Sequence, residues 1–336
     1  MTLNNNFWKN KRVLITGFEG FLGSHLTMEL ISCGAKIFGL DIKVKRKETI
    51  LAPLDYQKIK VIKGDVADYR LIKDAIETNT IQIVFHLAAE ALVGRGYKTP
   101  LKTFRSNICG TWSILEACRF AKKLEAVIIA SSDKAYGAHD NLPYKEGFPL
   151  IGNHPYDVSK SCADLITNTY FHTYGLPVAI TRCGNIYGPG DFNFCRLIPD
   201  TMRSLVLNKT LQIRSDGNFV RDYVYVADIV NGYIRIVELF KKLSLSGEAF
   251  NLSDEKPITV IKLLKEINRL NLCSKKLNYK IINTAKYEIK EQYLSSRKAQ
   301  RILGWKAQYS LEDGLRRTAK WYSEYFNPFP GNPRGF

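Results

Sequence analysis

Three glycines spaced three residues apart define the segment Gly17-Phe18-Glu19-Gly20-Phe21-Leu22-Gly23. This segment follows the apolar, β-branched run Arg12–Thr16 and opens a stretch over residues 21–30 in which apolar residues recur with helical spacing. A strand, a glycine turn and a helix start form an anion site, because unpaired backbone N–H groups and the helix dipole face the ligand and missing side chains let it approach. The spacing G-x-x-G-x-x-G departs from G-x-G-x-x-G, so taken alone it is also compatible with a simple tight turn.

A second predicted strand supports a dinucleotide site. Residues 35–41 end in Asp41, about where an acid that binds the adenosine ribose is expected. Asp41 would repel a 2′-phosphate, which favours NAD over NADP. The preference for NAD is weakened by the nearby basic residues Lys43, Lys45 and Arg46, because an arginine close to this strand end can bind such a phosphate. Without the glycine turn, Asp41 would be read as a solvated turn residue.

Strands and helices continue to alternate after this unit. Apolar runs at residues 60–63, 81–89 and 126–130 read as strands, and stretches at 69–76 and 101–121 read as helices. Such alternation predicts a parallel sheet with right-handed crossovers. The predicted fold class is therefore α/β, a Rossmann doubly wound parallel sheet with a smaller mixed α/β lobe. The expected boundaries are 1–184 for the Rossmann domain, 185–326 for a lobe that returns a strand or helix to it, and 327–336 for an irregular tail.

The run at 81–89 ends in His86-Leu87-Ala88-Ala89. Its small residues would let a cofactor backbone pass closely. A lone histidine among apolar neighbours is more often a hydrogen-bonded core residue than a catalyst, so His86 is predicted to be structural.

Composition narrows the class of protein. The chain has 336 residues with 45% hydrophobic residues, enough for a sizeable core. Its seven cysteines are odd in number and lack C-x-x-C spacing, which favours free thiols in a reducing compartment over disulfides or a zinc site. No signal peptide or membrane span is evident, so a cytosolic protein is expected, with no metal. The net charge of +17 raises the question of nucleic acid, but the basic clusters match no such motif and favour an anionic small molecule.

Two sets of polar residues point to chemistry. The run at 126–130 leads into Ser131-Ser132-Asp133-Lys134, so a buried strand delivers hydroxyls, a carboxylate and an amine at its carboxyl end, where α/β proteins bind ligands. Farther on, Tyr156 and Lys160 share one face of a helix predicted over 156–174. An ammonium beside a tyrosine, together with cofactor charge, lowers the phenol pKa from about 10 toward neutrality and makes it a general base.

These motifs together resemble the extended short-chain dehydrogenases/reductases of the nucleotide-sugar epimerase and dehydratase family. The resemblance runs from about Lys11 to Phe326 and includes residues 182–190, 221–228 and 296–305. It implies NAD as cofactor, a nucleotide-sugar substrate, and a homodimer formed through the helices at 101–121 and 156–174. The implied cofactor contacts are Gly17, Phe18, Glu19, Gly20, Phe21, Leu22, Gly23, Asp41, Asp65, Val66, Leu87, Ala88, Ala89, Asn107, Tyr156 and Lys160. The implied substrate contacts are Asn185, Arg196, Ile198, Pro199 and Arg221, although Arg221 could instead form an ordinary ion pair with the adjacent Asp222.

The reaction depends on Ser132-Asp133-Lys134. Epimerases of this family usually carry small or neutral residues after the serines, whereas this triplet is similar to the CDP-glucose branch of the 4,6-dehydratases. The resemblance implies that Tyr156, assisted by Ser132 and by Lys160, deprotonates the C4 hydroxyl while NAD accepts hydride. Lys134 would then remove the C5 proton, Asp133 would protonate the leaving C6 hydroxyl, and hydride would return to C6.

Three questions remain open from the sequence. Asp133 must be protonated and Lys134 neutral near pH 7, which burial favours but an ion pair between them would oppose. Residues 220–226 follow the general family pattern rather than that of the CDP-glucose branch, so CDP is the first choice of nucleotide with GDP, UDP and dTDP open. The competing functions are a nucleotide-sugar epimerase and a non-catalytic NAD-binding scaffold.

Overall fold

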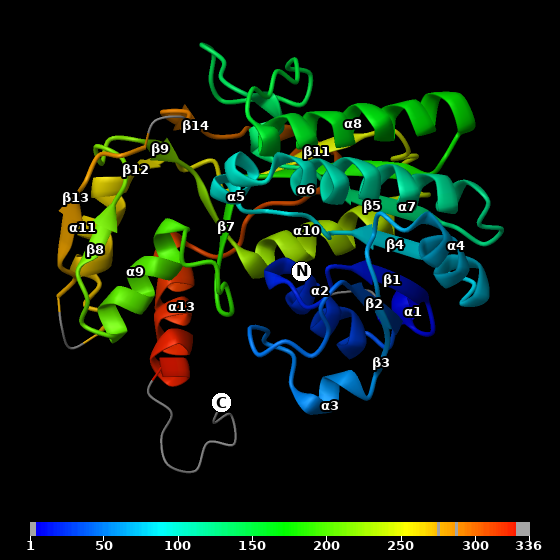
Figure 1. The fold of residues 1–336 in the computed structure, drawn as a ribbon, viewed down its shortest axis with the longest axis horizontal. Coiled ribbons are helices and arrows are strands. Elements are labelled where there is room, and N and C mark those ends of the chain that lie inside the picture. Colours follow the sequence, from blue (N-terminus) through cyan, green and yellow to red (C-terminus); the bar gives the residue numbers. More distant parts are fainter. Residues whose placement is uncertain (1–4, 274–275, 286–287, 327–336) are drawn as a thin grey trace.

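A seven-stranded sheet with the order β11-β6-β5-β4-β1-β2-β3 lies at the centre of the protein (Figure 1), and every strand pair in it is parallel. The structure is a computed structural model that describes residues 5–273, 276–285 and 288–326. The tail predicted at 327–336 lies outside the described residues. The α/β Rossmann class predicted from the alternating pattern is confirmed.

The strands of this sheet form where the sequence has short apolar runs. Their bounds are β1 Arg12–Thr16, β2 Lys36–Asp41, β3 Ile59–Lys63, β4 Ile83–His86, β5 Ala126–Ala130, β6 Val178–Cys183 and β11 Ala249–Leu252. Strands covered on both faces are apolar throughout rather than alternating, and β4 and β6 are buried at every position. The predicted strand at 81–89 is shorter than expected, because the chain leaves the sheet after His86.

Helices cover both faces of the sheet (Figure 1). One layer contains α4 (Tyr69–Thr78), α7 (Gly110–Arg119) and α8 (Pro155–Tyr174), and the other contains α2 (Phe21–Ser32), α10 (Val226–Leu239) and α12 (Arg297–Leu303). Each layer encloses its own apolar core against the sheet. Short helices α1 (Asn5–Trp8) and α3 (Pro53–Tyr56) lie near the β1 to β3 side.

The single helix predicted over 101–121 is wrong in detail. Helices α5 (Val93–Lys98) and α6 (Pro100–Phe104) precede a π-helical turn at Arg105–Cys109, and α7 follows that turn without a break. The residue types at 105–109 are compatible with an ordinary helix, which is why the turn was not predicted. It places the Asn107 side chain, 2% exposed, between α8 and the loop after β4.

A smaller lobe packs beside the carboxyl ends of the strands and has its own core. Its helices are α9 Leu197–Val206, α11 Val260–Arg269 and α13 Leu311–Phe326. Its strands are β7 Asn185–Tyr187, β8 Leu211–Ile213, β9 Val220–Arg221, β10 Tyr223–Tyr225, β12 Ile258–Thr259, β13 Tyr279–Ile281 and β14 Glu291–Gln292. The chain does not stay in this lobe, because β11 returns as the edge strand beside β6.

Candidate active site

The strand order places one site at the carboxyl edge of the sheet. β1 pairs with β2 on one side and with β4 on the other, so the order of strands reverses at β1. Thr16 at the end of β1 lies opposite Leu40 and His86. Ligands of open α/β sheets bind in the crevice formed at such a reversal. The glycine turn that leaves β1 therefore opens into this crevice.

The glycine turn has the close packing that a dinucleotide cradle needs. Gly17 has φ +70°, and a Cβ placed there would lie 2.9 Å from the Ala88 Cα atom. A Cβ on Gly23 would lie 2.1 Å from the Gly17 carbonyl oxygen, so the start of α2 can rest on the turn only with glycine there. Gly20 precedes α2 and has no side chain to cap it, which leaves the first-turn N–H groups for an anion. These residues fit the pyrophosphate of NAD.

The side chains of Phe18 and Glu19 point away from that cradle. Phe18 is fully buried against Gly39 of β2. The fully buried Glu19 carboxylate accepts hydrogen bonds from the backbone N–H groups of Lys45 (2.6 Å) and Arg46 (2.8 Å). Only the backbone of these two residues is thus available to a cofactor, and Glu19 fixes the loop that follows β2.

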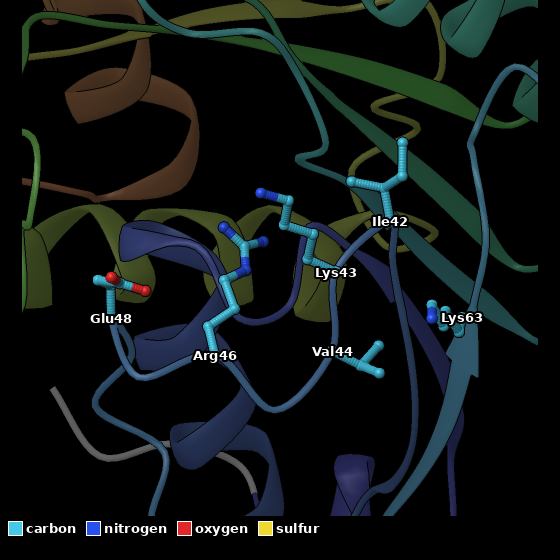
Figure 2. Close-up of a pocket in the computed structure, with 6 residues that line it drawn as sticks. All are labelled: Ile42, Lys43, Val44, Arg46, Glu48 and Lys63. Atoms are coloured by element: carbon cyan, nitrogen blue, oxygen red, sulfur yellow. The ribbon is translucent and has the colours of Figure 1, made fainter. Parts of the chain in front are cut away.

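Asp41 at the end of β2 is paired with a cation. Its carboxylate, 5% exposed, receives the guanidinium of Arg46 and the backbone N–H of Lys43, the latter at 3.3 Å. Figure 2 shows the adjoining pocket, about 400 Å³ in volume, whose lining includes Lys43, Arg46, Lys63 and a single acid, Glu48. Lys43 and Arg46 extend in the same direction from the loop. The repulsion that Asp41 alone would exert on a 2′-phosphate is therefore partly cancelled.

This ion pair predicts a change in cofactor selectivity. In Arg46→Ala the Asp41 carboxylate is freed for the ribose hydroxyls and the positive charge near the 2′ position falls. We expect the affinity ratio of NADH over NADPH to rise about tenfold, which corresponds to ~1.4 kcal/mol. Fluorescence titration with both reduced dinucleotides measures the ratio, and Arg12→Ala, at the amino end of β1, is the control. An unchanged ratio would show that Arg46 does not influence selectivity.

The other predicted cofactor residues surround this crevice. His86 is confirmed as a structural residue, because its ring nitrogens contact the hydroxyls of Thr16 (2.9 Å) and Thr111 (3.3 Å) and burial lowers its pKa to about 3. Asn107 binds the Glu90 backbone and donates to the Ser159 hydroxyl at 2.9 Å. The remaining predicted positions follow the ends of β3 and β4: Asp65, Val66, Leu87, Ala88 and Ala89. Their contact with a cofactor stays a prediction.

Tyr156 and Lys160 lie on one face of α8, as predicted. The Lys160 ammonium lies 5.9 Å from the centre of the Tyr156 ring and donates to the Ala130 carbonyl at 2.7 Å. The expected fall in the tyrosine pKa depends on cofactor charge as well and stays a prediction; among the protein's own groups, burial raises the pKa of Tyr156 to about 12, although Arg196 and Ser132 act in the opposite direction. Burial also lowers the pKa of Lys160 to about 8, which weakens its charge at Tyr156.

The loop after β5 begins with a 3-10 turn over Asp133–Tyr136. Ser132 donates to Asp133 Oδ1 at 2.9 Å, and the ammonium of Lys134 lies 3.4 Å from Asp133 Oδ2. The ion pair that the sequence left open is therefore present. Burial nonetheless lowers the pKa of Lys134, because desolvation outweighs the nearby carboxylates of Asp133 and Asp157. The lysine is thus moved toward the neutral form that a base requires.

The predicted substrate residues lie in or beside the smaller lobe. Asn185 on β7 donates to the Asp222 carbonyl at 3.2 Å. Arg196 is the N-cap residue of α9; its side chain is 41% exposed and pairs with Asp191 at 3.1 Å. Ile198 and Pro199 follow in α9 and are buried there. Binding of substrate by these residues stays a prediction.

The ion pair considered for Arg221 and Asp222 is not formed. Its guanidinium donates to the backbone carbonyls of Val220 (2.7 Å), Ile289 (2.5 Å) and Lys290 (2.9 Å). The neighbouring Asp222 is fully buried and accepts from Ser253 and from the Leu294 backbone N–H instead. Arg221 is therefore anchored between β9 and the chain before β14, with its charge at this edge of the site.

Gln292 was not anticipated from the sequence. It lies on β14, and its side-chain amide contacts both Lys134 and the Asp133 carbonyl. No motif marks this glutamine, and only the three-dimensional structure brings it to Lys134 and Asp133, which are 158 and 159 positions earlier in the chain.

The fold and this site define a Rossmann-class dinucleotide enzyme of the short-chain dehydrogenase/reductase type. Within the described residues no helix combines the length and apolar content that crossing a membrane requires. In the same part of the chain, no three His, Cys, Asp or Glu side chains are grouped so that they could hold a metal ion.

The chain belongs to the GDP-mannose 4,6 dehydratase family, whose sequence model matches residues 14–318. The CDP-glucose 4,6-dehydratase of Salmonella typhimurium is 29% identical, over 96% of this chain and 93% of that protein. UDP-glucuronate 4-epimerase 3 of Arabidopsis thaliana is 30% identical, over 94% of this chain and 77% of that protein. The solved dTDP-glucose 4,6-dehydratase DesIV of Streptomyces venezuelae, with NAD bound, has a TM-score of 0.82 and 28% identity, over 93% of this chain and 97% of that one. The chain also spans 47% or 48% of the length of three trifunctional Arabidopsis thaliana relatives.

Proposed function

We propose that this protein is an NAD-dependent nucleotide-sugar 4,6-dehydratase that converts an NDP-hexose to an NDP-4-keto-6-deoxyhexose and water. The single observation that carries this proposal is the placement of Ser132. Its hydroxyl donates to Asp133 Oδ1 at 2.9 Å and interacts with the Tyr156 hydroxyl, and Asp133 in turn pairs with Lys134, so a candidate base for C4 oxidation adjoins a candidate acid and base for elimination of water. An epimerase needs the first group but has no use for the other two.

The proposed proton transfers follow from these contacts. NAD, bound at the glycine turn, supplies the hydride acceptor at C4 and returns the hydride at C6. Tyr156 removes the C4 hydroxyl proton, with Ser132 orienting that hydroxyl. Once C4 is a ketone the C5 proton is acidic, and Lys134, whose pKa is lowered by burial, removes it. Asp133 first takes the proton that Lys134 releases across their ion pair and then gives it to the departing C6 hydroxyl, while Ser132 donates a hydrogen bond to its other oxygen.

CDP is the proposed nucleotide. The triplet Ser132-Asp133-Lys134 and the similarity to a Salmonella enzyme of that name support this choice. Arg221 and Asn185 would receive the diphosphate, because a planar guanidinium can donate two hydrogen bonds to it. We also propose that the reaction takes place in the cytosol, which the seven unpaired cysteines support.

The test is a product assay. The purified protein is incubated with NAD and, separately, with CDP-, GDP-, UDP- and dTDP-hexoses, and products are identified by mass spectrometry and NMR. Loss of water to give a 4-keto-6-deoxy sugar is the expected result, with the highest kcat/KM for the CDP sugar. A C4-inverted sugar that keeps its water would establish the epimerase alternative, and absence of any product from the whole panel would favour the scaffold alternative.

A homodimer is part of the proposal. Large apolar side chains are exposed on three helices of one layer: Leu101 (83%) on α6, Trp112 (47%) on α7 and Leu165 (57%) on α8. Large exposed apolar side chains on neighbouring helices favour a protein interface.

Light scattering at micromolar concentration should give the mass of a dimer. Leu165→Asp should shift the population toward the monomer, because it places a charge in the apolar contact. Leu54→Asp, at a 69% exposed position on α3, is the matched control and should remain dimeric. A monomeric wild-type protein would contradict the prediction.

A further inference from the structure

Gln292 connects the smaller lobe to the loop that carries Asp133 and Lys134. Its side chain is fully buried. The amide oxygen accepts a hydrogen bond from the Lys134 ammonium, and the amide nitrogen donates to the Asp133 backbone carbonyl at 3.0 Å. One side chain thus contacts both residues of the pair from outside their own loop.

The strand that carries Gln292 also contacts Arg221. Strands β14 and β9 are parallel, and Gln292 is the register partner of Arg221. Arg221 holds the chain just before β14 through the carbonyls of Ile289 and Lys290. The arginine that we propose binds the diphosphate and the glutamine that binds Lys134 are therefore opposite each other on paired strands.

The charges around Lys134 explain why an amide suits this position. Asp133 lies within 3.4 Å, Asp157 on α8 adds a second negative charge, and Arg221 on β9 adds a positive one. A carboxylate in place of Gln292 would bind the proton of Lys134 more firmly, and an apolar side chain would leave the ammonium with fewer partners. An amide oxygen accepts a hydrogen bond from the ammonium and carries no net charge.

We propose that Gln292 is a positioning residue that holds the Lys134 amine toward the sugar and keeps it able to exchange its proton. The proposal rests on the proposed function, in which Lys134 is the base for the C5 proton. Its link to Arg221 further implies that binding of the nucleotide diphosphate and placement of this base involve the same pair of strands.

The test compares two substitutions with opposite expected effects. Elimination requires neutral Lys134 together with protonated Asp133, so the rate rises with pH where Lys134 loses its proton while Asp133 still carries one. Gln292→Glu should raise the pKa of Lys134 and move this rise about 1–2 pH units upward, as an opposite charge at this distance does. Gln292→Met removes a partner of the ammonium, so the rise should move downward and kcat should fall about tenfold while KM changes by less than about twofold. Gln212→Glu makes the same charge change at an exposed position on β8 and should leave the profile in place.

A second measurement does not depend on turnover. The pH dependence of acylation of Lys134 by an amine-reactive reagent, measured by peptide mass spectrometry, should give midpoints that move in the same two directions. Shifted labelling midpoints in a protein that yields no sugar product would support the role of Gln292 and count against the dehydratase proposal. Identical labelling midpoints in wild type and in whichever Gln292 variants fold would overturn the role of Gln292, whatever their activity or melting temperature.

Discussion

Tyr156→Phe is expected to lower kcat by a factor of about 10²–10⁴, the usual contribution of a general base. The ring stays in place against α8 neighbours while the hydroxyl that contacts Ser132 is lost. Lys160 keeps its bond to the Ala130 carbonyl, so NAD should bind with nearly unchanged affinity. Steady-state rates and calorimetric titration with NAD measure the two effects separately.

Tyr174→Phe is the matched control for this variant. It makes the same substitution on the same helix, at a position that is 52% exposed at the far end of α8. Its activity should equal that of the wild type. If Tyr156→Phe retained full activity, Tyr156 would not be the base and the enzyme assignment would have to be reconsidered.

Lys134→Met is expected to stop elimination but not oxidation. The methionine fills a similar volume without an amine, so the C5 proton has no base and formation of the 4-keto-6-deoxy product should fall by about 10²–10⁴. Tyr156 and Ser132 remain in place, so the C4 step should still occur. Rapid mixing should then show reduced dinucleotide that accumulates instead of being consumed.

Lys145→Met is the matched control for Lys134→Met. It replaces an exposed lysine in the same loop region and should leave both C4 oxidation and elimination intact. Loss of C4 oxidation together with elimination would mean that Lys134 serves the whole site rather than one step. A normal rate of product formation would remove Lys134 from the mechanism and leave the epimerase alternative favoured.

Local patterns were sufficient to predict most of the fold. The apolar run before Gly17, the strand at 126–130 and the helix from Tyr156 to Tyr174 each have a period and a clear end in the sequence. The π-helical turn at Arg105–Cys109 was missed, because it adds a residue without changing the residue types.

The candidate site was less predictable because its properties depend on burial and on distant contacts. The sequence placed an ammonium beside Tyr156, but the desolvation that raises the pKa of this tyrosine depends on what packs around it in three dimensions. The ion pair between Asp41 and Arg46 depends on the conformation of the loop after β2, which Glu19 fixes from the protein interior. Gln292 reaches Lys134 through strand pairing that no local pattern records.

Strand β11 is synthesised long after β6, the strand with which it pairs in the sheet. During synthesis β6 emerges well before Ala249–Leu252, so the outer edge of β6 stays unpaired while β7, α9 and α10 are being added. An exposed parallel strand is a template for aggregation. A fragment cut at residue 184 would keep that edge open permanently, so the nucleotide-binding half is better produced within the whole chain than as an excised domain.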